Sequence, residues 1–116
     1  FNDTQLSLQN KKIISNKKSA QSICDALLAP QPGNITFPIN QNTLSGGLTV
    51  SDLDVKKTII QLAENLKIIV EPGGAVAAAA LLFNKIEIKN KTVVVMISGS
   101  NIDYSFFSSI IAQQYE

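Results

Sequence analysis

Apolar side chains recur every three or four residues between positions 51 and 67. The positions that share this spacing are Val55, Ile59, Leu62, Ala63 and Leu66. Such a period places them on one face of an α-helix. Ser51 precedes Asp54 by three residues, which predicts a capping box at the start of this helix. Lys67 is expected to close it. This is the best-marked helix of the chain.

Short apolar runs flank a stretch of small residues in the carboxyl-terminal half. The predicted elements are, in order, a strand at 67–70, a break at 71–74, a small-residue helix at 75–83, a polar connection at 84–91, a strand at 92–97 and a closing helix at 102–114. A strand, a crossover helix and a second strand form a β-α-β unit with parallel strands. The pattern therefore predicts an α/β fold with a partial open parallel sheet and flanking helices.

The amino-terminal half has a weaker pattern. We expect a weak helix end at 1–12, a short strand at 13–14, a helix at 19–29, a turn at 30–33 and a strand at 46–50. Between them, residues 34–39 contain β-rich side chains, but Pro38 favours an edge strand or an irregular segment.

Composition narrows the classes of function. The chain has 116 residues, of which 45% are hydrophobic and 16% charged, so it can form a folded core. Its net charge is +1 and all ten basic residues are lysines, which argues against a nucleic-acid partner. No apolar run approaches the roughly 20 residues that span a bilayer, so no membrane partner is expected. The single cysteine, Cys24, fits a reducing compartment and predicts a cytoplasmic protein. Without histidine, the chain itself excludes histidine-based metal sites and Ser-His triads.

Polar residues follow both predicted strands of the β-α-β unit. Glu71 comes directly after the first strand, and Ser98 and Gly99 come after the second. Ligands of open parallel sheets bind beyond the carboxyl ends of the strands, so these residues are candidates for a binding site. Glycines at 73, 74 and 99 are expected to let backbone and ligand approach closely. In the alternative interpretation, Ser98 only caps the next helix and Glu71 is solvated.

The same residues carry a resemblance to a known family. The segments TVSDLDVKKTIIQLAENLKIIVEPGGAVAAAALL and KTVVVMISGSNID are similar to those of the serine/threonine dehydratases and serine racemases, which are pyridoxal-phosphate enzymes of fold type II. The earlier segments SICDALLAPQPGNITFPI and LTVSD are similar to that family as well. The resemblance implies that the chain is part of the large, cofactor-binding domain of such an enzyme.

The resemblance also implies roles for individual residues. Ser98 would hydrogen-bond the pyridine nitrogen of pyridoxal 5'-phosphate, with Gly99 beside it, and Glu71 would lie near the cofactor ring. A neutral hydroxyl does not hold that nitrogen protonated as a carboxylate would, which suits loss of a β-hydroxyl from an amino-acid substrate. Ser100 and Gly73 depart from the family pattern, which has glycine and serine there.

Two family features are missing from the sequence. Neither the lysine that forms the Schiff base nor the glycine-rich phosphate loop is recognisable. We therefore expect residues 1–116 to be the carboxyl-terminal portion of the cofactor-binding domain, inactive alone, with the amino-terminal remainder of the parent enzyme as its partner. The parent is expected to be a homo-oligomer that deaminates L-serine or L-threonine to a 2-oxo acid.

Other interpretations stay open at this point. The parent could be a serine racemase, or the chain could be a non-catalytic binding module that keeps the fold. The opening residues FNDTQLSL resemble a stretch that carries a divalent-cation site in some family members. Asp3 would then be a ligand of Mg²⁺ or Ca²⁺, which both prefer oxygen ligands.

Overall fold

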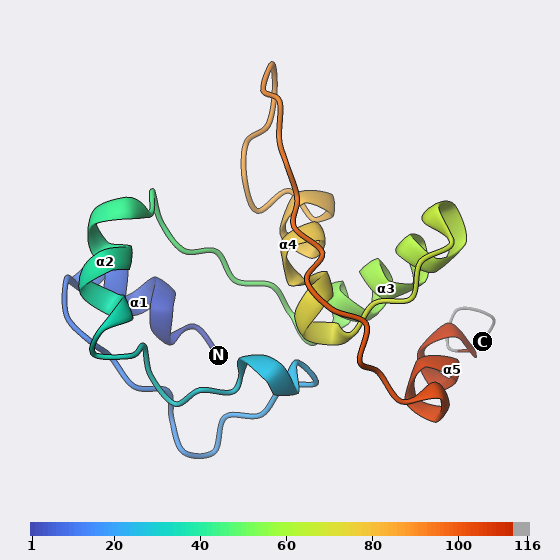
Figure 1. Ribbon diagram of the computed structural model, residues 1–116, viewed down its shortest axis with the longest axis horizontal. Helices are drawn as coiled ribbons and strands as arrows, with labels where there is room; N and C mark the ends of the chain where they lie inside the picture. Colours follow the sequence, from blue (N-terminus) through green and yellow to red (C-terminus); the bar gives the residue numbers. More distant parts are fainter. Residues whose placement is uncertain (113–116) are drawn as a thin grey trace. The chain divides into compact units, whose positions relative to one another are not determined.

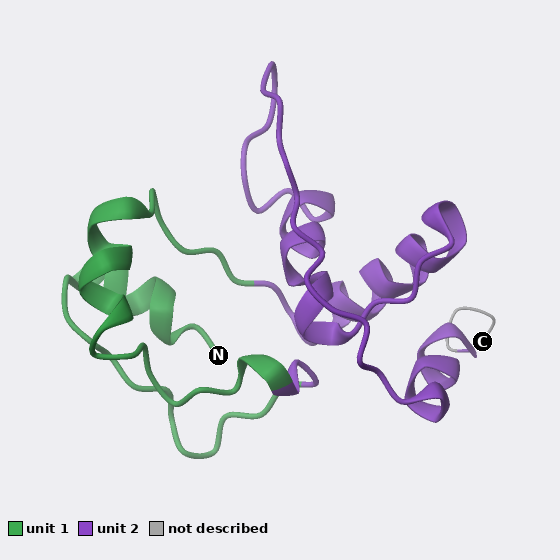
Figure 2. Ribbon diagram, viewed as in Figure 1, with its two compact units in different colours: residues 1–22, 26–49 green, residues 23–25, 50–116 purple. Residues whose placement is uncertain are grey.

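The computed structural model describes residues 1–112, which form two compact units (Figure 2). The first unit comprises residues 1–22 and 26–49, and the second comprises residues 23–25 and everything described from residue 50 onward. The described elements are helices joined by extended or irregular segments (Figure 1). Among residues 1–112, no helix combines the length and the apolar character that a bilayer crossing requires.

The first unit contains α1 (Asp3–Asn10) and α2 (Thr36–Thr43) and is held largely by polar contacts. Ser7 on α1 is fully buried, and its hydroxyl accepts a hydrogen bond from the Ile14 N–H at 2.8 Å. The backbone N–H of Asn16 donates to the Pro30 carbonyl at 2.8 Å. These bonds give order to segments that have little apolar surface to bury. The predicted amino-terminal helix is confirmed as α1.

Helix α2 occupies the segment that Pro38 was expected to keep irregular, so that prediction is wrong. Pro38 is the third residue of the helix. The first-turn N–H groups of a helix have no partner within it, so a proline there removes no hydrogen bond. The helix begins where the Gly33 carbonyl accepts from the Phe37 N–H at 2.9 Å, and Phe37 is buried.

The second unit packs α3 (Asp52–Leu66) against α4 (Pro72–Leu82) and α5 (Tyr104–Ala112). The buried apolar residues that form its core are Cys24, Val55, Ile59, Leu62, Val70, Ala75, Ala78, Ala79 and Ile110. Three of the residues on the predicted face of α3 are therefore buried, and the capping box of Ser51 and Asp54 is present. Alanines on α4 allow that helix to lie close to α3, because a small side chain keeps the two backbones near each other.

Helix α4 begins three residues earlier than predicted, since the expected break at 71–74 is its first turn. Pro72 is the first helical residue, where its fixed φ favours the helix and its missing N–H is not needed. Gly73 and Gly74 follow within the helix and both are buried. The predicted closing helix is present as α5, and its expected end at 113–114 lies outside the described residues.

The predicted helix at 19–29 is wrong. Only a single 3-10 turn, η1 (Asp25–Leu27), occurs there. The Ile23 N–H, which a helix would use internally, instead donates to the Asp52 carboxylate at 3.1 Å.

The predicted parallel sheet is not present among residues 1–112, and the predicted strands at 13–14, 46–50, 67–70 and 92–97 make no ladder there. Segments 67–70 and 92–97 are joined, within the described chain, by one backbone bond near their ends, from the Glu71 N–H to the Gly99 carbonyl at 3.1 Å. A sheet requires repeated pairing along neighbouring strands. Side chains still alternate as in a strand, because Val95 and Ile97 pack on the core whereas Val94 and Met96 are 89% and 71% exposed.

The capping box of α3 is expected to make stability sensitive to acid. The Ser51 N–H donates to the Asp54 carboxylate at 3.2 Å, and chiefly this bond lowers the pKa of Asp54 below its ordinary value of 3.8. Because the folded pKa lies below the unfolded one, the contribution is present above pH 3.8 and is lost as the pH falls through the folded value. We expect Asp54→Asn to flatten the fall in stability below pH 3.8, measured by urea unfolding. Glu64→Gln, on an exposed position of α3, is the control and should leave the acid dependence unchanged. Equal acid dependence in Asp54→Asn and the unmodified protein would contradict the prediction.

Candidate functional site

Glu71 joins the start of α4 to the 98–101 loop. It is the N-cap of α4, with extended backbone angles of φ −75° and ψ 158°. Its backbone N–H donates to the Gly99 carbonyl at 3.1 Å, and its carboxylate oxygen Oε2 accepts from the Asn101 N–H at 2.8 Å. Of the candidate residues, Glu71 and Gly99 are therefore joined directly, and Ser98 is the residue that precedes Gly99 in the same loop.

Gly74 and Gly99 are needed for the contact between the loop and the helix. A Cβ atom added to Gly74 would lie 2.7 Å from the Gly99 carbonyl oxygen and 2.9 Å from its nitrogen. A Cβ atom added to Gly99 would lie 2.6 Å from the Glu71 oxygen Oε1. The sequence predicted that these glycines let backbone and ligand approach closely. The structure shows the close approach of backbone at Gly74, which admits the backbone of Gly99, and Gly99 admits the Glu71 carboxylate. The approach of a ligand stays a prediction. The missing Cβ atoms set the position of the loop.

Ser98 lies at the entrance of this loop and is exposed. Within residues 1–112, no group hydrogen-bonds to its hydroxyl. It is not the cap of α5, because that helix begins six residues later at Tyr104. An exposed hydroxyl can donate to a neutral aromatic nitrogen, so its chemistry fits the pyridine ring of pyridoxal phosphate.

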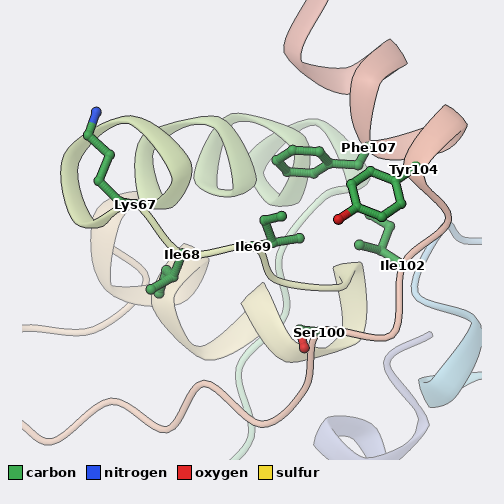
Figure 3. Close-up of a pocket in the computed structure, with 7 residues that line it drawn as sticks. All are labelled: Lys67, Ile68, Ile69, Ser100, Ile102, Tyr104 and Phe107. Atoms are coloured by element: carbon green, nitrogen blue, oxygen red, sulfur yellow. The ribbon is translucent and has the colours of Figure 1, made fainter.

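The same loop borders a cavity of about 520 Å³ through Ser100 (Figure 3). Its lining residues are Lys67, Ile68, Ile69, Ser100, Ile102, Tyr104 and Phe107. Figure 3 shows the rings of Tyr104 and Phe107 together with Ile102 on one side and Ser100 on the other. The sequence analysis did not identify this cavity. The apolar residues at 102 and 107 were predicted only as part of the closing helix, and only the fold brings them to Ile69.

The structure gives Ser100 a specific environment, because its side chain lines this cavity. The sequence marked it as a departure from the family pattern, and the structure places it at the edge of the cavity. Its hydroxyl is one of three polar groups on the lining side chains, with the Lys67 amine and the Tyr104 hydroxyl.

Asp3 lies in the first unit and is 8% exposed. Its Oδ1 atom accepts from the Asn16 side-chain amide at 2.6 Å, and its Oδ2 atom accepts from the Thr4 hydroxyl at 3.4 Å. Among the residues that the structure describes, no three acidic, histidine or cysteine side chains gather as metal ligands would. The carboxylate of Asp3 holds Asn16, and its role as a cation ligand stays a prediction.

Several known proteins are similar to this chain in sequence. The family description of the pyridoxal-phosphate dependent enzymes matches residues 3–99. The L-threonine ammonia-lyase of Thermotoga maritima is 33% identical over 90 residues, which are 78% of this chain and 22% of that protein. The serine racemase of Schizosaccharomyces pombe is 32% identical over 112 residues, which are 97% of this chain and 34% of that protein.

A solved structure allows the folds to be compared as well. The serine racemase of Dictyostelium discoideum superimposes with a TM-score of 0.77 at 35% identity, over 88% of this chain and 32% of that one. The chain thus spans between 22% and 34% of the length of these relatives. The recognised family and its fold type are confirmed, although the parallel sheet is not seen in this part. By both sequence and structure, the chain belongs to the family of pyridoxal-phosphate-dependent enzymes that includes threonine ammonia-lyases and serine racemases.

Proposed function

We propose that the complete protein is a pyridoxal-phosphate-dependent ammonia-lyase that converts L-serine or L-threonine to a 2-oxo acid and ammonia. This chain supplies one wall of the active site. The observation that carries the proposal is the exposed hydroxyl of Ser98, at the entrance of a loop that Glu71 holds against α4. The relative named L-threonine ammonia-lyase supports the type of reaction.

In this proposal, Ser98 binds and orients the cofactor. Its hydroxyl donates to the pyridine nitrogen, and Gly99 leaves the adjacent backbone without a side chain. Pyridoxal phosphate, when bound, supplies an electron sink for charge that develops at the substrate α-carbon. A neutral hydroxyl leaves the ring nitrogen unprotonated, so the sink is weaker than with a carboxylate partner. With the cofactor bound, such a sink would favour prompt loss of the β-hydroxyl from the substrate.

The rest of the parent enzyme is proposed to cover the extended segments. Val94 and Met96 are 89% and 71% exposed, and Ile69 is exposed on the neighbouring segment. Exposed apolar side chains in extended segments are a surface on which further strands can pair. The chain alone is therefore expected to be inactive, since it carries neither the Schiff-base lysine nor the phosphate loop.

Racemisation of serine is the second candidate. The serine racemase of Schizosaccharomyces pombe matches 97% of the chain, so this region does not separate the two activities. The products do: a lyase releases a 2-oxo acid and ammonia, whereas a racemase converts L-serine to D-serine. A cytoplasmic location, a homo-oligomeric parent and a Mg²⁺ or Ca²⁺ ion near Asp3 remain predictions.

Ser98→Ala in the complete protein tests the proposal. We expect cofactor affinity to fall about tenfold and product formation to fall by at least as much, because one hydrogen bond to the ring is lost. Cofactor absorbance gives the affinity, and release of 2-oxo acid gives the activity. Ser108→Ala, on an exposed position of α5, is the matched control and should change neither. Two outcomes would contradict the proposal. One is a complete protein that binds no pyridoxal phosphate, and the other is a Ser98→Ala variant with unchanged affinity and activity.

A further inference from the structure

We infer that Glu71 is a positioning residue that acts through the backbone of the 98–101 loop: its carboxylate holds that loop by accepting from the Asn101 N–H, and so fixes where the Ser98 hydroxyl is presented. The inference deepens the proposed function and rests on it for the role of Ser98. The hold on the loop itself requires no cofactor.

The first support is the unusual use of an N-cap side chain. N-cap residues are usually short, and their side chains accept from the first free N–H groups of their own helix. Glu71 occupies the N-cap of α4 but makes no such bond. Its carboxylate reaches instead to the Asn101 N–H, 30 residues further along the chain, at 2.8 Å. A glutamate here gives up helix capping for a bond to the loop.

The second support is the space above Gly99. An added Cβ atom at Gly99 would lie 2.6 Å from Oε1, 2.8 Å from the carboxyl carbon and 3.1 Å from Oε2 of Glu71. The carboxylate group thus fills the place that any other residue at 99 would need for its side chain. Glycine at 99 and glutamate at 71 are therefore two parts of one arrangement.

The third support is the set of anchors around Ser98. The next residue, Gly99, is bonded through its carbonyl to the Glu71 N–H, and the Ser100 carbonyl accepts from the Ile102 N–H at 2.9 Å. Asn101 is bonded to the Glu71 carboxylate. Ser98 has no hydrogen bond of its own to a described group. The position of the Ser98 backbone, from which the hydroxyl projects, is therefore held by the anchors that follow it in the chain.

Two substitutions distinguish this role from one in which the negative charge of Glu71 acts directly on the cofactor. Glu71→Gln keeps an oxygen that can accept from Asn101, whereas Glu71→Ala keeps none. In the complete protein, we expect Glu71→Ala to speed amide exchange at Asn101 about tenfold and to weaken cofactor binding by a similar factor. Glu71→Gln should change each by less than about threefold, since one acceptor bond remains.

Hydrogen–deuterium exchange resolved to single amides measures the hold on the loop, and cofactor titration measures its consequence. Unchanged exchange at Asn101 in Glu71→Ala would overturn the inference. So would a Gln variant as defective as the Ala variant, because charge rather than the hydrogen bond would then be required. If the complete protein binds no cofactor, the proposed function fails, but the exchange result still decides whether Glu71 holds the loop.

A double variant tests the coupling between the two positions. Gly99→Ala should displace the carboxylate and speed exchange at Asn101 about as much as Glu71→Ala does, roughly tenfold. In the Glu71→Ala background, Gly99→Ala should add less than about twofold, because the group that it displaces is already gone. Full additivity of the two effects would show that the residues act independently and would overturn the inference.

Discussion

Gly74→Ala is expected to destabilise the complete protein by about 2–3 kcal/mol, although alanine is the better helix former. In an unobstructed helix, the same exchange would stabilise by about 1 kcal/mol. Here the added Cβ atom would meet the Gly99 oxygen at 2.7 Å and the Gly99 nitrogen at 2.9 Å. These are backbone atoms that cannot rotate away, so the 98–101 loop must shift. The steric term therefore outweighs helix propensity, and cofactor affinity should fall with stability.

The control for this prediction is Gly46→Ala. An added Cβ atom at Gly46 would meet nothing within 4 Å. Urea unfolding should therefore show a change of no more than about 0.5 kcal/mol for this variant. A Gly74→Ala protein that is as stable as the unmodified one, or more stable, would show that the loop does not rest against α4 as the structure has it.

Ile59→Ala is expected to lower the free energy of unfolding by about 2–5 kcal/mol. Ile59 lies on α3 and is 0% exposed, within the core of the second unit. Alanine removes the buried apolar atoms and leaves a cavity that the surrounding helices fill only in part. Because the same core supports α4, whose first turn receives the loop, we also expect weaker cofactor binding.

Leu53→Ala provides the matched control on the same helix. Leu53 is 59% exposed, so the substitution removes few buried contacts and should change stability by less than about 1 kcal/mol. The midpoint of urea unfolding measures both variants. Equal effects at positions 53 and 59 would contradict the packing of α3 described above.

The parts of the fold that could be predicted are those that depend on residues close together in the sequence. Helix α3 was predicted with its cap because spacing and capping are properties of neighbouring residues. The start of α4 was missed because proline and glycines usually mark a break, yet proline also suits the first position of a helix. The helix expected at 19–29 did not form, and one of its N–H groups, that of Ile23, is bonded by Asp52, a residue 29 positions away.

The sequence named candidate residues for the site but not their arrangement. Sequence similarity pointed to Ser98, Gly99 and Glu71, and the structure describes all three around one loop. Sequence similarity did not predict that the Glu71 carboxylate would fill the space above Gly99. The spacing of residues along the chain does not give the distance between two segments that are far apart in the sequence. Their roles toward the cofactor remain predictions that the variants above address.

By itself, the sequence determined the family, the capped helix α3 and the residue types at the carboxyl-end loop, since these depend on neighbouring residues and on motif order. Only the tertiary structure decided that Gly74 and Gly99 lie in contact, that Glu71 bonds to Asn101, and that Ile69 and Phe107 line one cavity. The physical reason is that these contacts join segments about 25 to 40 residues apart. Their geometry depends on how α3, α4 and α5 pack, which no local pattern encodes.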